Sequence, residues 1–331
     1  MAGLVQRSYS LERIPRCDLY ARGVNDTYRI DTSDGAFYLR VYRFGWRSRA
    51  EIEAELEMLI HLARRQAPVC RPIAQSDGSL VSLLDCPEGE RHAVLFSAAP
   101  GAVVDYKDFT ERQAYLYGRA SAAIHQAADS YQGSRERPAF DLTTLVDEPF
   151  SLVSSALSHR LADRDFLDKV GQRLRSRVEA ADGLTLGFCH GDFHGGNANL
   201  SDESFTFYDF DCCGWGYRAY DIAIFPWAFA LTGAEPSRID RMGRSFLSGY
   251  SSRQALACED VVAIPEFVSI RQVWLMGLQI GLAERFGSGW LTDRYFDRQL
   301  QVLRDWEATY VRRPIEEWLS VVSGDGSDTA N

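Results

Sequence analysis

The stretch His190-Gly191-Asp192-Phe193-His194-Gly195-Gly196-Asn197, followed by Asp209-Phe210-Asp211, decides how this 331-residue chain is interpreted. A short apolar run ends at Cys189, so the stretch begins where a predicted strand passes into a loop. It contains an aspartate, then an asparagine, then a second aspartate, at the spacing with which phosphoryl-transfer enzymes hold a hydroxyl and magnesium ions around a nucleotide. The stretch therefore predicts phosphoryl transfer.

A hairpin is predicted directly after this loop. Residues 198–200 and 205–208 are strand-like, and the polar residues 201–204 between them are typical of a turn. Pairing across that turn brings Asn197 and Asp209 side by side at the open end of the hairpin. Because magnesium takes oxygen ligands, these two residues are the candidate metal ligands, with phosphates and water completing the coordination.

Asp192 is the candidate catalytic residue, because a carboxylate in this loop can orient an acceptor hydroxyl and accept its proton. Taken singly, an aspartate or asparagine in a glycine-rich loop is more often a turn residue, so the joint spacing carries the prediction. Asp211 shares a strand face with Asp209 and is either a second metal ligand or a side chain that bonds the loop backbone; the second role is favoured. His190 is expected to be structural, and the role of His194 stays open.

The N-terminal region must use arginine as its phosphate anchor, because no lysine precedes Lys107. Residues 20–44 alternate like a hairpin with a turn at Asp34-Gly35, and this pattern places Arg40 on the strand face opposite to the apolar positions. That is where the strand lysine of a kinase meets phosphates, although a surface arginine is an equally ordinary outcome.

A helix predicted over residues 51–65 supports this role for Arg40. Its apolar stripe, with Ile52 and Leu59 among its members, also contains Glu55. A carboxylate inside an apolar stripe is costly unless a cation meets it. The sequence therefore predicts an ion pair between Arg40 and Glu55.

Two further segments are candidates for binding a nucleotide. Gly23 and Asn25 lie in a small polar loop where backbone N–H groups can approach a phosphate; an ordinary turn is the alternative. Residues 93–96 form a buried-strand pattern that runs into Pro100-Gly101, which predicts a hinge. There, backbone groups of Ser97 and Ala98 are expected to be free to bond an adenine edge.

Composition limits the classes of function. The formal charge is −10, from 36 Lys and Arg against 46 Asp and Glu, which argues against nonspecific binding of nucleic acid or of an anionic membrane. No run approaches the roughly 20 apolar residues that span a bilayer, and residues 1–7 lack a signal-peptide pattern. The seven cysteines are an odd number without metal-ligand spacing, which favours reduced thiols. A cytoplasmic protein, monomeric or homodimeric, is expected.

The chain is expected to fold as two lobes of the α+β class. Residues 1–100 would form a small antiparallel-sheet lobe with one main helix that binds the nucleotide, residues 101–323 a larger, mostly helical lobe for catalysis and acceptor binding, and residues 324–331 a polar tail. A capping box at Thr110 and Gln113 opens the first helix of the second lobe. Apolar residues then recur at helical spacing over residues 151–180, 219–232, 263–285 and 293–319.

The whole pattern resembles the aminoglycoside phosphotransferase and choline kinase-like superfamily. The resemblance rests on the string from His190 to Asn197, on Asp209-Phe210-Asp211 and on Ala219-Tyr220-Asp221. The remaining features follow in the expected order, namely the Gly23 loop, the Arg40 strand, Glu55 and the Pro100-Gly101 hinge. Arg137-Pro138 and Trp290-Leu291-Thr292 are most similar to the branch of homoserine-kinase-like enzymes and bacterial stress-response kinases.

This resemblance implies a protein-kinase-like fold, ATP or GTP in the cleft between two lobes, and magnesium-dependent transfer to a hydroxyl. It also implies that Asp192 is the catalytic base, that Asn197 and Asp209 bind the metal and that Asp221 steadies the catalytic loop.

Three positions depart from the family pattern. Arg40 replaces the usual lysine and has a different reach, although its fork can still clamp phosphate. Tyr38 replaces a small or aliphatic residue that would pack on the adenine, and Asp211 stands where many members have glycine. The base pocket and the metal site are therefore expected to differ from those of typical members.

The expected function is transfer of the γ-phosphate to a hydroxyl of a small molecule such as an amino alcohol, a hydroxy amino acid or an aminoglycoside-like compound. The alternatives are a Ser/Thr protein kinase of the stress-response type and a nucleotide-binding regulator without catalysis. Aromatic rings and a bidentate arginine suit such acceptors, so the candidate acceptor residues are Trp215, Tyr217, Arg271 and Trp274. Core packing is the more common role of each tryptophan taken singly.

Overall fold

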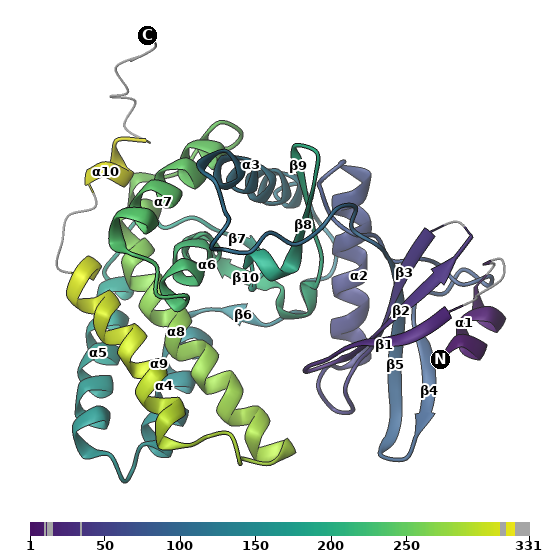
Figure 1. Cartoon of the computed structure of the whole chain (residues 1–331), viewed down its shortest axis with the longest axis horizontal. Coiled ribbons are helices and arrows are strands. Elements are labelled where there is room, and N and C mark those ends of the chain that lie inside the picture. The colour runs from purple at the N-terminus through teal and green to yellow at the C-terminus, as the bar shows by residue number, and fades with distance from the viewer. Residues whose placement is uncertain (10, 12–15, 34, 312–315, 322–331) are drawn as a thin grey trace.

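Alternating residues in the first hundred positions build an antiparallel sheet in the computed structural model (Figure 1). The structure describes residues 1–9, 11, 16–33, 35–311 and 316–321. Thr32 pairs with Gly35, which confirms the predicted hairpin, while Asp34 of its turn lies outside the described residues. The strand order is β1-β2-β3-β5-β4, with bounds β1 (Arg16–Arg22), β2 (Asp26–Thr32), β3 (Gly35–Val41), β4 (Ser82–Cys86) and β5 (Gly89–Ser97).

Apolar side chains on one face of this sheet form a small core with helix α1 (Ala2–Ser8). Ile30, Leu39 and Val5 are fully buried there. Because successive strand residues point to opposite faces, this core fixes the side chain of Arg40 on the other face, as the sequence predicts.

Helix α2 (Arg49–Arg64) lies on that other face, between the sheet and the rest of the molecule (Figure 1). Ser48 and Glu51 form a capping box at its N-terminus, which satisfies two backbone donors of the first turn. Glu55 is fully buried in its apolar stripe, and this placement confirms the expectation that a cation must meet it.

The region after position 110 is mainly helical, as predicted. A capping box of Thr110 and Gln113 starts the first of its helices. One helix, over residues 236–251, is absent from the prediction, although Ile239, Met242 and Phe246 recur at helical spacing and are buried. The helices are α3 (Glu111–Ala128), η1 (Thr143–Asp147), α4 (Glu148–Ala156), α5 (Leu161–Glu179), α6 (Arg218–Leu231), α7 (Pro236–Ser251), α8 (Cys258–Phe286), α9 (Asp293–Trp306), η4 (Glu307–Val311) and α10 (Glu316–Leu319). The polar tail predicted over residues 324–331 lies outside the described residues.

Two small sheets hold the stretch on which the functional prediction rests. One has the order β6-β10-β7, formed by β6 (Ala139–Phe140), β10 (Gly214–Tyr217) and β7 (Leu186–Cys189). The other is the predicted hairpin of β8 (Ala198–Ser201) and β9 (Ser204–Phe207). Short 3-10 turns, η2 (Gly195–Asn197) and η3 (Phe210–Cys212), lie at its open end. There the Tyr208 N–H donates to the Asn197 carbonyl at 3.0 Å, so Asn197 lies beside the residue that precedes Asp209.

The hinge between the two regions is fastened to this hairpin. Ala102 and Leu200 exchange backbone hydrogen bonds of 3.1 and 2.8 Å, and the Asn199 amide donates to the Ala99 carbonyl at 3.1 Å. Gly101 has a φ of +81°, and a Cβ there would lie 1.9 Å from the Leu200 carbonyl oxygen. Only glycine fits this close approach of two backbones.

Helix α8 corrects one expectation from the sequence. Its segment Cys258–Ala283 has the length and mean hydropathy of a membrane-spanning helix, although no such run was expected. In the fold, 78% of its most apolar window is buried inside the protein, where it packs against α4 and α6. It is therefore the central helix of the C-terminal core.

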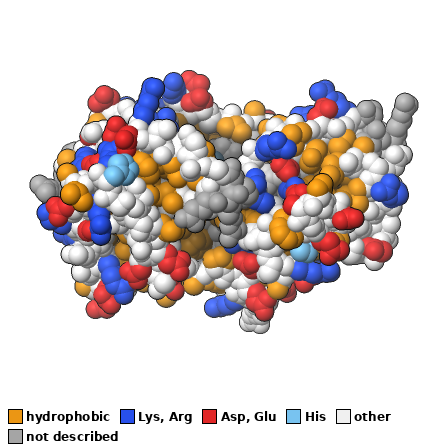
Figure 2. Space-filling view, turned by 90° about the horizontal axis from the view of Figure 1, so that it is seen from below, with side chains coloured by type: hydrophobic (Ala, Val, Ile, Leu, Met, Phe, Trp, Pro, Cys, Tyr) orange, Lys and Arg blue, Asp and Glu red, His pale blue; other side chains and the backbone are white. Residues whose placement is uncertain are grey.

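Charged side chains of both signs are interspersed over the face shown in Figure 2, and hydrophobic side chains gather toward its middle. Among the described residues on this face, Lys and Arg side chains form no extended stripe of the kind that binds a nucleic-acid backbone.

Candidate active site

The loop after β7 is held in place by close packing at Gly191 and by the carboxylate of Asp221. Gly191 has a φ of +78°, and a Cβ there would lie 2.3 Å from the Cys212 carbonyl oxygen, so the loop can pack against η3 only with glycine. The Asp221 carboxylate accepts hydrogen bonds from the backbone N–H groups of His190 and Gly191 at 2.6 and 2.7 Å. Asp221 is itself bonded by the buried His125 at 3.0 Å. This is the contact expected of a residue that steadies the loop.

Asp192 projects from this loop with both carboxylate oxygens engaged. Oδ2 accepts from Asn197 Nδ2 at 3.0 Å and lies 3.3 Å from His194 Nε2, while Oδ1 is paired with Arg271. His194 Nδ1 accepts the Gly196 N–H at 3.0 Å, so Nε2 carries the proton and can donate to Asp192. Burial raises the pKa of Asp192, but the interactions with His194 and Arg271 outweigh it and hold this pKa well below its ordinary value. The carboxylate is therefore ionised at neutral pH.

Asn197 and Asp209 line one cavity, as their pairing across the hairpin predicts. Asn197 uses its Nδ2 for the carbonyl and the carboxylate of Asp192, which leaves Oδ1 as its oxygen for a cation. The Asp209 carboxylate is half exposed in this cavity, and its backbone is left-handed, with a φ of +63°, a conformation that aspartate tolerates better than most residues.

A magnesium ion fits this pair of residues only together with a nucleotide. Among the described residues, no group of three or more His, Cys, Asp or Glu side chains can hold a metal ion alone. Magnesium sites that use one or two protein oxygens normally complete their octahedron with phosphates and water. Asn197 and Asp209 therefore fit a metal that arrives with the nucleotide.

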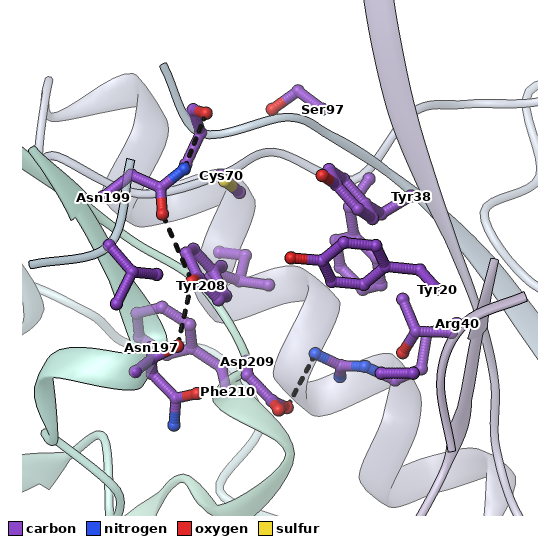
Figure 3. A pocket seen from close by; sticks show the side chains of 17 residues that line it. Tyr20, Tyr38, Arg40, Cys70, Ser97, Asn197, Asn199, Tyr208, Asp209 and Phe210 are labelled. Atoms are coloured by element: carbon purple, nitrogen blue, oxygen red, sulfur yellow. Dashed lines mark hydrogen bonds and ion pairs between the residues drawn. The ribbon is translucent and has the colours of Figure 1, made fainter. Parts of the chain in front are cut away.

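The predicted ion pair between Arg40 and Glu55 is confirmed. Arg40 Nη1 donates to Glu55 Oε1 at 2.8 Å, and its Nη2 donates to Asp209 Oδ1 at 3.0 Å. The Tyr42 hydroxyl donates to the other Glu55 oxygen at 2.9 Å. Figure 3 shows the guanidinium directed at Asp209 across the cavity. Arg40 is thus oriented from both sides, by Glu55 behind it and by Asp209 in front.

The cavity around Arg40 has a volume of about 280 Å³ and is rich in aromatic rings. Tyr20 and Tyr38 meet edge to face, with ring centroids 5.1 Å apart, on one side of it, and Tyr208 lies opposite (Figure 3). Tyr38 lines the cavity, and the expected difference of this pocket from those of typical family members stays a prediction. Flat aromatic walls suit a nucleotide base.

The loop that contains Gly23 and Asn25 lies next to the cavity-lining strands and does not itself line the cavity. Neither Gly23 nor Asn25 is among the residues that line the cavity, whereas Ala21 and Thr27 of the flanking strands are. The Asn25 side chain is bonded to Asp211 at 3.0 Å and to the Arg43 N–H at 3.1 Å. The Gly23 N–H donates to the Asn25 carbonyl at 3.0 Å, and the expected approach of the loop backbone to a phosphate stays a prediction.

The hinge differs from expectation at Ser97. Its N–H donates to the Arg71 carbonyl at 2.9 Å, and its hydroxyl accepts the Arg71 N–H at 3.0 Å. The expectation of a free Ser97 N–H is therefore wrong, because an irregular segment before β4 pairs with the end of β5. The Ala98 backbone has no hydrogen bond to the residues that the structure describes, and Ala98 itself does not line the cavity.

Asp211 has partners that the sequence did not indicate. Its carboxylate is buried and accepts from Asn25 at 3.0 Å, from Trp46 Nε1 at 2.7 Å and from Arg47 Nε at 3.2 Å. Within the described chain, no bond joins this carboxylate to the backbone of its own loop, which was the favoured role. Arg47 and Trp46 precede α2, so Asp211 joins the turn η3 to the N-terminal region.

The four candidate acceptor residues divide into two pairs. Trp215 stacks on Tyr131 with centroids 6.1 Å apart, which is the packing role that was its alternative, and Tyr217 packs on Phe267 at 5.5 Å. Arg271 bonds Asp192, and Trp274 lies against its guanidinium with 4.8 Å to the ring centroid. The second pair therefore lies at the catalytic loop.

Tyr106 is a site residue that sequence reasoning missed. Its hydroxyl accepts the N–H of Gly195 in the loop from His190 to Asn197. Burial raises its pKa, so the hydroxyl stays protonated. Tyr106 lies in an irregular segment after the hinge, where neither periodicity nor a motif marks it.

Comparison with known proteins decides the family. The sequence profile described as "Phosphotransferase enzyme family" matches residues 21–256, which is well over half of the chain. The chain belongs to this phosphotransferase enzyme family. The match confirms the resemblance that the catalytic stretch indicated, and it makes the protein a kinase-type phosphotransferase.

Relatives of this family member align with more than three quarters of its length. A protein of Deinococcus radiodurans is 38% identical over 93% of this chain and 89% of its own length. The amicoumacin kinase of Bacillus subtilis is 26% identical over 77% of this chain and 76% of its own. Among solved structures, an amicoumacin kinase, hAmiN, in complex with AMP-PNP, Ca2+ and Ami, superposes with a TM-score of 0.75. That structure is 19% identical and covers 95% of this chain and 93% of its own, so this likeness shows the fold.

Proposed function

We propose that this phosphotransferase transfers the γ-phosphate of ATP, bound as its magnesium complex, to a hydroxyl of a small molecule. The observation that supports the proposal is the convergence of Asn197 and Asp209 on one cavity, with Asp192 bonded to Asn197 at its edge. Phosphoryl transfer needs little covalent chemistry from the protein, and this arrangement supplies what it does need, namely positioning and charge.

Each group in the cavity has a role in this proposal. The base would lie between the rings of Tyr20 and Tyr38 and that of Tyr208, and Arg40 would clamp the phosphates. Asn197 and Asp209 would hold magnesium, which supplies charge neutralisation when it is bound. The ionised Asp192 would orient the acceptor hydroxyl and take its proton as the oxygen attacks the γ-phosphorus.

The comparisons favour a small acceptor and a nucleotide with a divalent metal. Amicoumacin kinase acts on a small molecule by its name, and the hAmiN complex holds AMP-PNP and Ca2+. We therefore propose residues 1–100 as the nucleotide lobe and residues 101–323 as the lobe that binds an amino alcohol, a hydroxy amino acid or an aminoglycoside-like compound. The cytoplasm is the compartment proposed for this reaction.

The test is ADP release with magnesium and ATP over a panel of amino alcohols, hydroxy amino acids, aminoglycosides and protein substrates, with GTP in parallel. Asp192→Asn should lower kcat by about 100-fold or more for the best acceptor, because it removes the base. Asp202→Asn makes the same chemical change in the exposed turn of the β8–β9 hairpin and should leave kcat unchanged. Activity of Asp192→Asn within a few-fold of wild type would show that another group is the base. Binding of ATP without turnover of any acceptor would favour the regulator instead.

A further inference from the structure

Arg271 is a buried cation in direct contact with the proposed base. It belongs to α8 and is 2% exposed. Its Nη2 pairs with Asp192 Oδ1, while its Nη1 donates to the Gly191 carbonyl at 3.1 Å and to the Tyr220 hydroxyl at 3.0 Å. One side chain thus contacts both the carboxylate and the backbone of the catalytic loop.

Two tryptophans fix the orientation of this guanidinium. The rings of Trp227 and Trp274 each lie with their centroid 4.8 Å from the Arg271 Cζ. Trp227 is held in turn, because its Nε1 donates to Gln272 Oε1 at 2.8 Å. A planar guanidinium between aromatic faces loses little further freedom when it forms a hydrogen bond. The fork is therefore preorganised for Asp192.

These contacts leave Arg271 unsuited to the acceptor-binding role expected from the sequence. Both terminal nitrogens are already directed to the loop or to Tyr220. Its Nε lies buried without an acceptor in the described part of the chain. A buried donor without a partner lowers the free energy of unfolding. The position that directs the other two nitrogens at Asp192, Gly191 and Tyr220 therefore carries this cost at Nε.

The pairing also decides which oxygen of Asp192 can act. Oδ2 is approached by two donors, Asn197 Nδ2 and His194 Nε2, whereas Oδ1 is approached by Arg271 alone. A carboxylate oxygen accepts about two hydrogen bonds, so Oδ1 keeps the position for an acceptor hydroxyl.

We propose that Arg271 is a positioning residue that holds the Asp192 carboxylate and the Gly191 carbonyl in the geometry of phosphoryl transfer and presents Oδ1 to the acceptor. This inference rests on the proposed function of Asp192. In the step, the acceptor O–H bond breaks as its oxygen bonds the γ-phosphorus, Oδ1 takes the proton, and the bond from phosphorus to the ADP oxygen breaks. Arg271 itself touches neither substrate.

Chemical rescue of Arg271→Ala tests the proposal. The substitution leaves a space between Trp227 and Trp274 that fits a guanidinium. We expect kcat with the best acceptor to fall about 100-fold or more, while KM for ATP changes by less than about threefold, because the nucleotide pocket is untouched. Millimolar ethylguanidinium should restore kcat at least tenfold, whereas its neutral analogue ethylurea should not. Arg271→Lys should retain an intermediate kcat, since it keeps the charge without the fork.

Hydrogen exchange of the peptide covering residues 190–197 provides a readout that needs no activity. It should be faster in Arg271→Ala and should return to the wild-type rate with ethylguanidinium. Arg173→Ala is the matched control, because it breaks the ion pair with Glu307 in the same lobe and should leave exchange of this loop unchanged. Unchanged loop exchange in Arg271→Ala would overturn the proposal whether or not the wild type transfers phosphate. Equal rescue by ethylurea would overturn it too, since it would show that the filled space matters and the charge does not.

Discussion

Removing the guanidinium of Arg40 should destabilise the protein as well as weaken nucleotide binding. Arg40→Ala leaves Glu55, which is fully buried, with the Tyr42 hydroxyl as its remaining partner among the side-chain contacts described above. Removing one partner of a buried ion pair typically lowers the free energy of unfolding by about 3–5 kcal/mol, because the other charge stays buried without a partner. Since Tyr42 still donates to Glu55 and Asp209 is half exposed, we expect the lower end, about 3 kcal/mol.

Urea denaturation of single and double variants measures this free energy. Glu55→Leu combined with Arg40→Ala removes both charges, so the double variant should be more stable than the sum of the single losses predicts, by about 2 kcal/mol or more. Arg49→Ala breaks an exposed ion pair with Glu53 on the same helix and should cost about 0.5 kcal/mol or less. If Arg40→Ala is no more destabilising than Arg49→Ala, or if the single losses simply add, the buried pair does not act as described.

Three more outcomes are expected. Asp209→Asn should raise the magnesium concentration that half-saturates ADP release by about tenfold or more, because it removes the charged ligand candidate; unchanged magnesium dependence would rule this ligand out. Gly101→Ala should lower the free energy of unfolding by at least about 2 kcal/mol more than Gly45→Ala does. Both glycines have a positive φ, but only at Gly101 would a Cβ lie against backbone atoms. Equal losses of stability in thermal melts would contradict this close approach. Burial raises the pKa of Cys70, which lines the proposed nucleotide cavity, to about 12, so this side chain is a thiol at neutral pH. It should react with iodoacetamide far more slowly than the exposed Cys258, and still more slowly with ATP present; mass spectrometry of the labelled peptides measures this.

Short patterns in the sequence predicted the contacts that depend on strand or helix periodicity and on a short turn. Glu55 could be paired with Arg40 because a carboxylate in an apolar stripe requires a cation, and the strand period placed Arg40 on the facing side. Asn197 and Asp209 could be brought together because a short turn fixes the register of the hairpin between them. The α+β fold could be predicted because apolar residues alternate in the N-terminal sheet and recur at helical spacing in the C-terminal region.

The remaining contacts depend on how distant segments pack, and periodicity reports burial without naming a partner. Asp211 meets Arg47 only because the two regions fold against each other, and nothing near either residue marks the pair. Arg271 is recognisable in the sequence as a member of a helix, but its partner Asp192 lies on a loop far away in the chain. Ser97 is paired by an irregular segment around Arg71, which has no repeating pattern to predict.

The hydrogen bonds to Asp211 limit how the two regions can move relative to each other. The N-terminal and C-terminal regions are joined by the hinge and also by the bonds from Trp46 and Arg47 to Asp211. Because the two regions are bonded at Asp211 as well as linked through the hinge, rotation about the hinge alone would have to break these bonds. In the proposed kinase, any opening needed to release the product nucleotide would therefore be coupled to the bonds at Asp211.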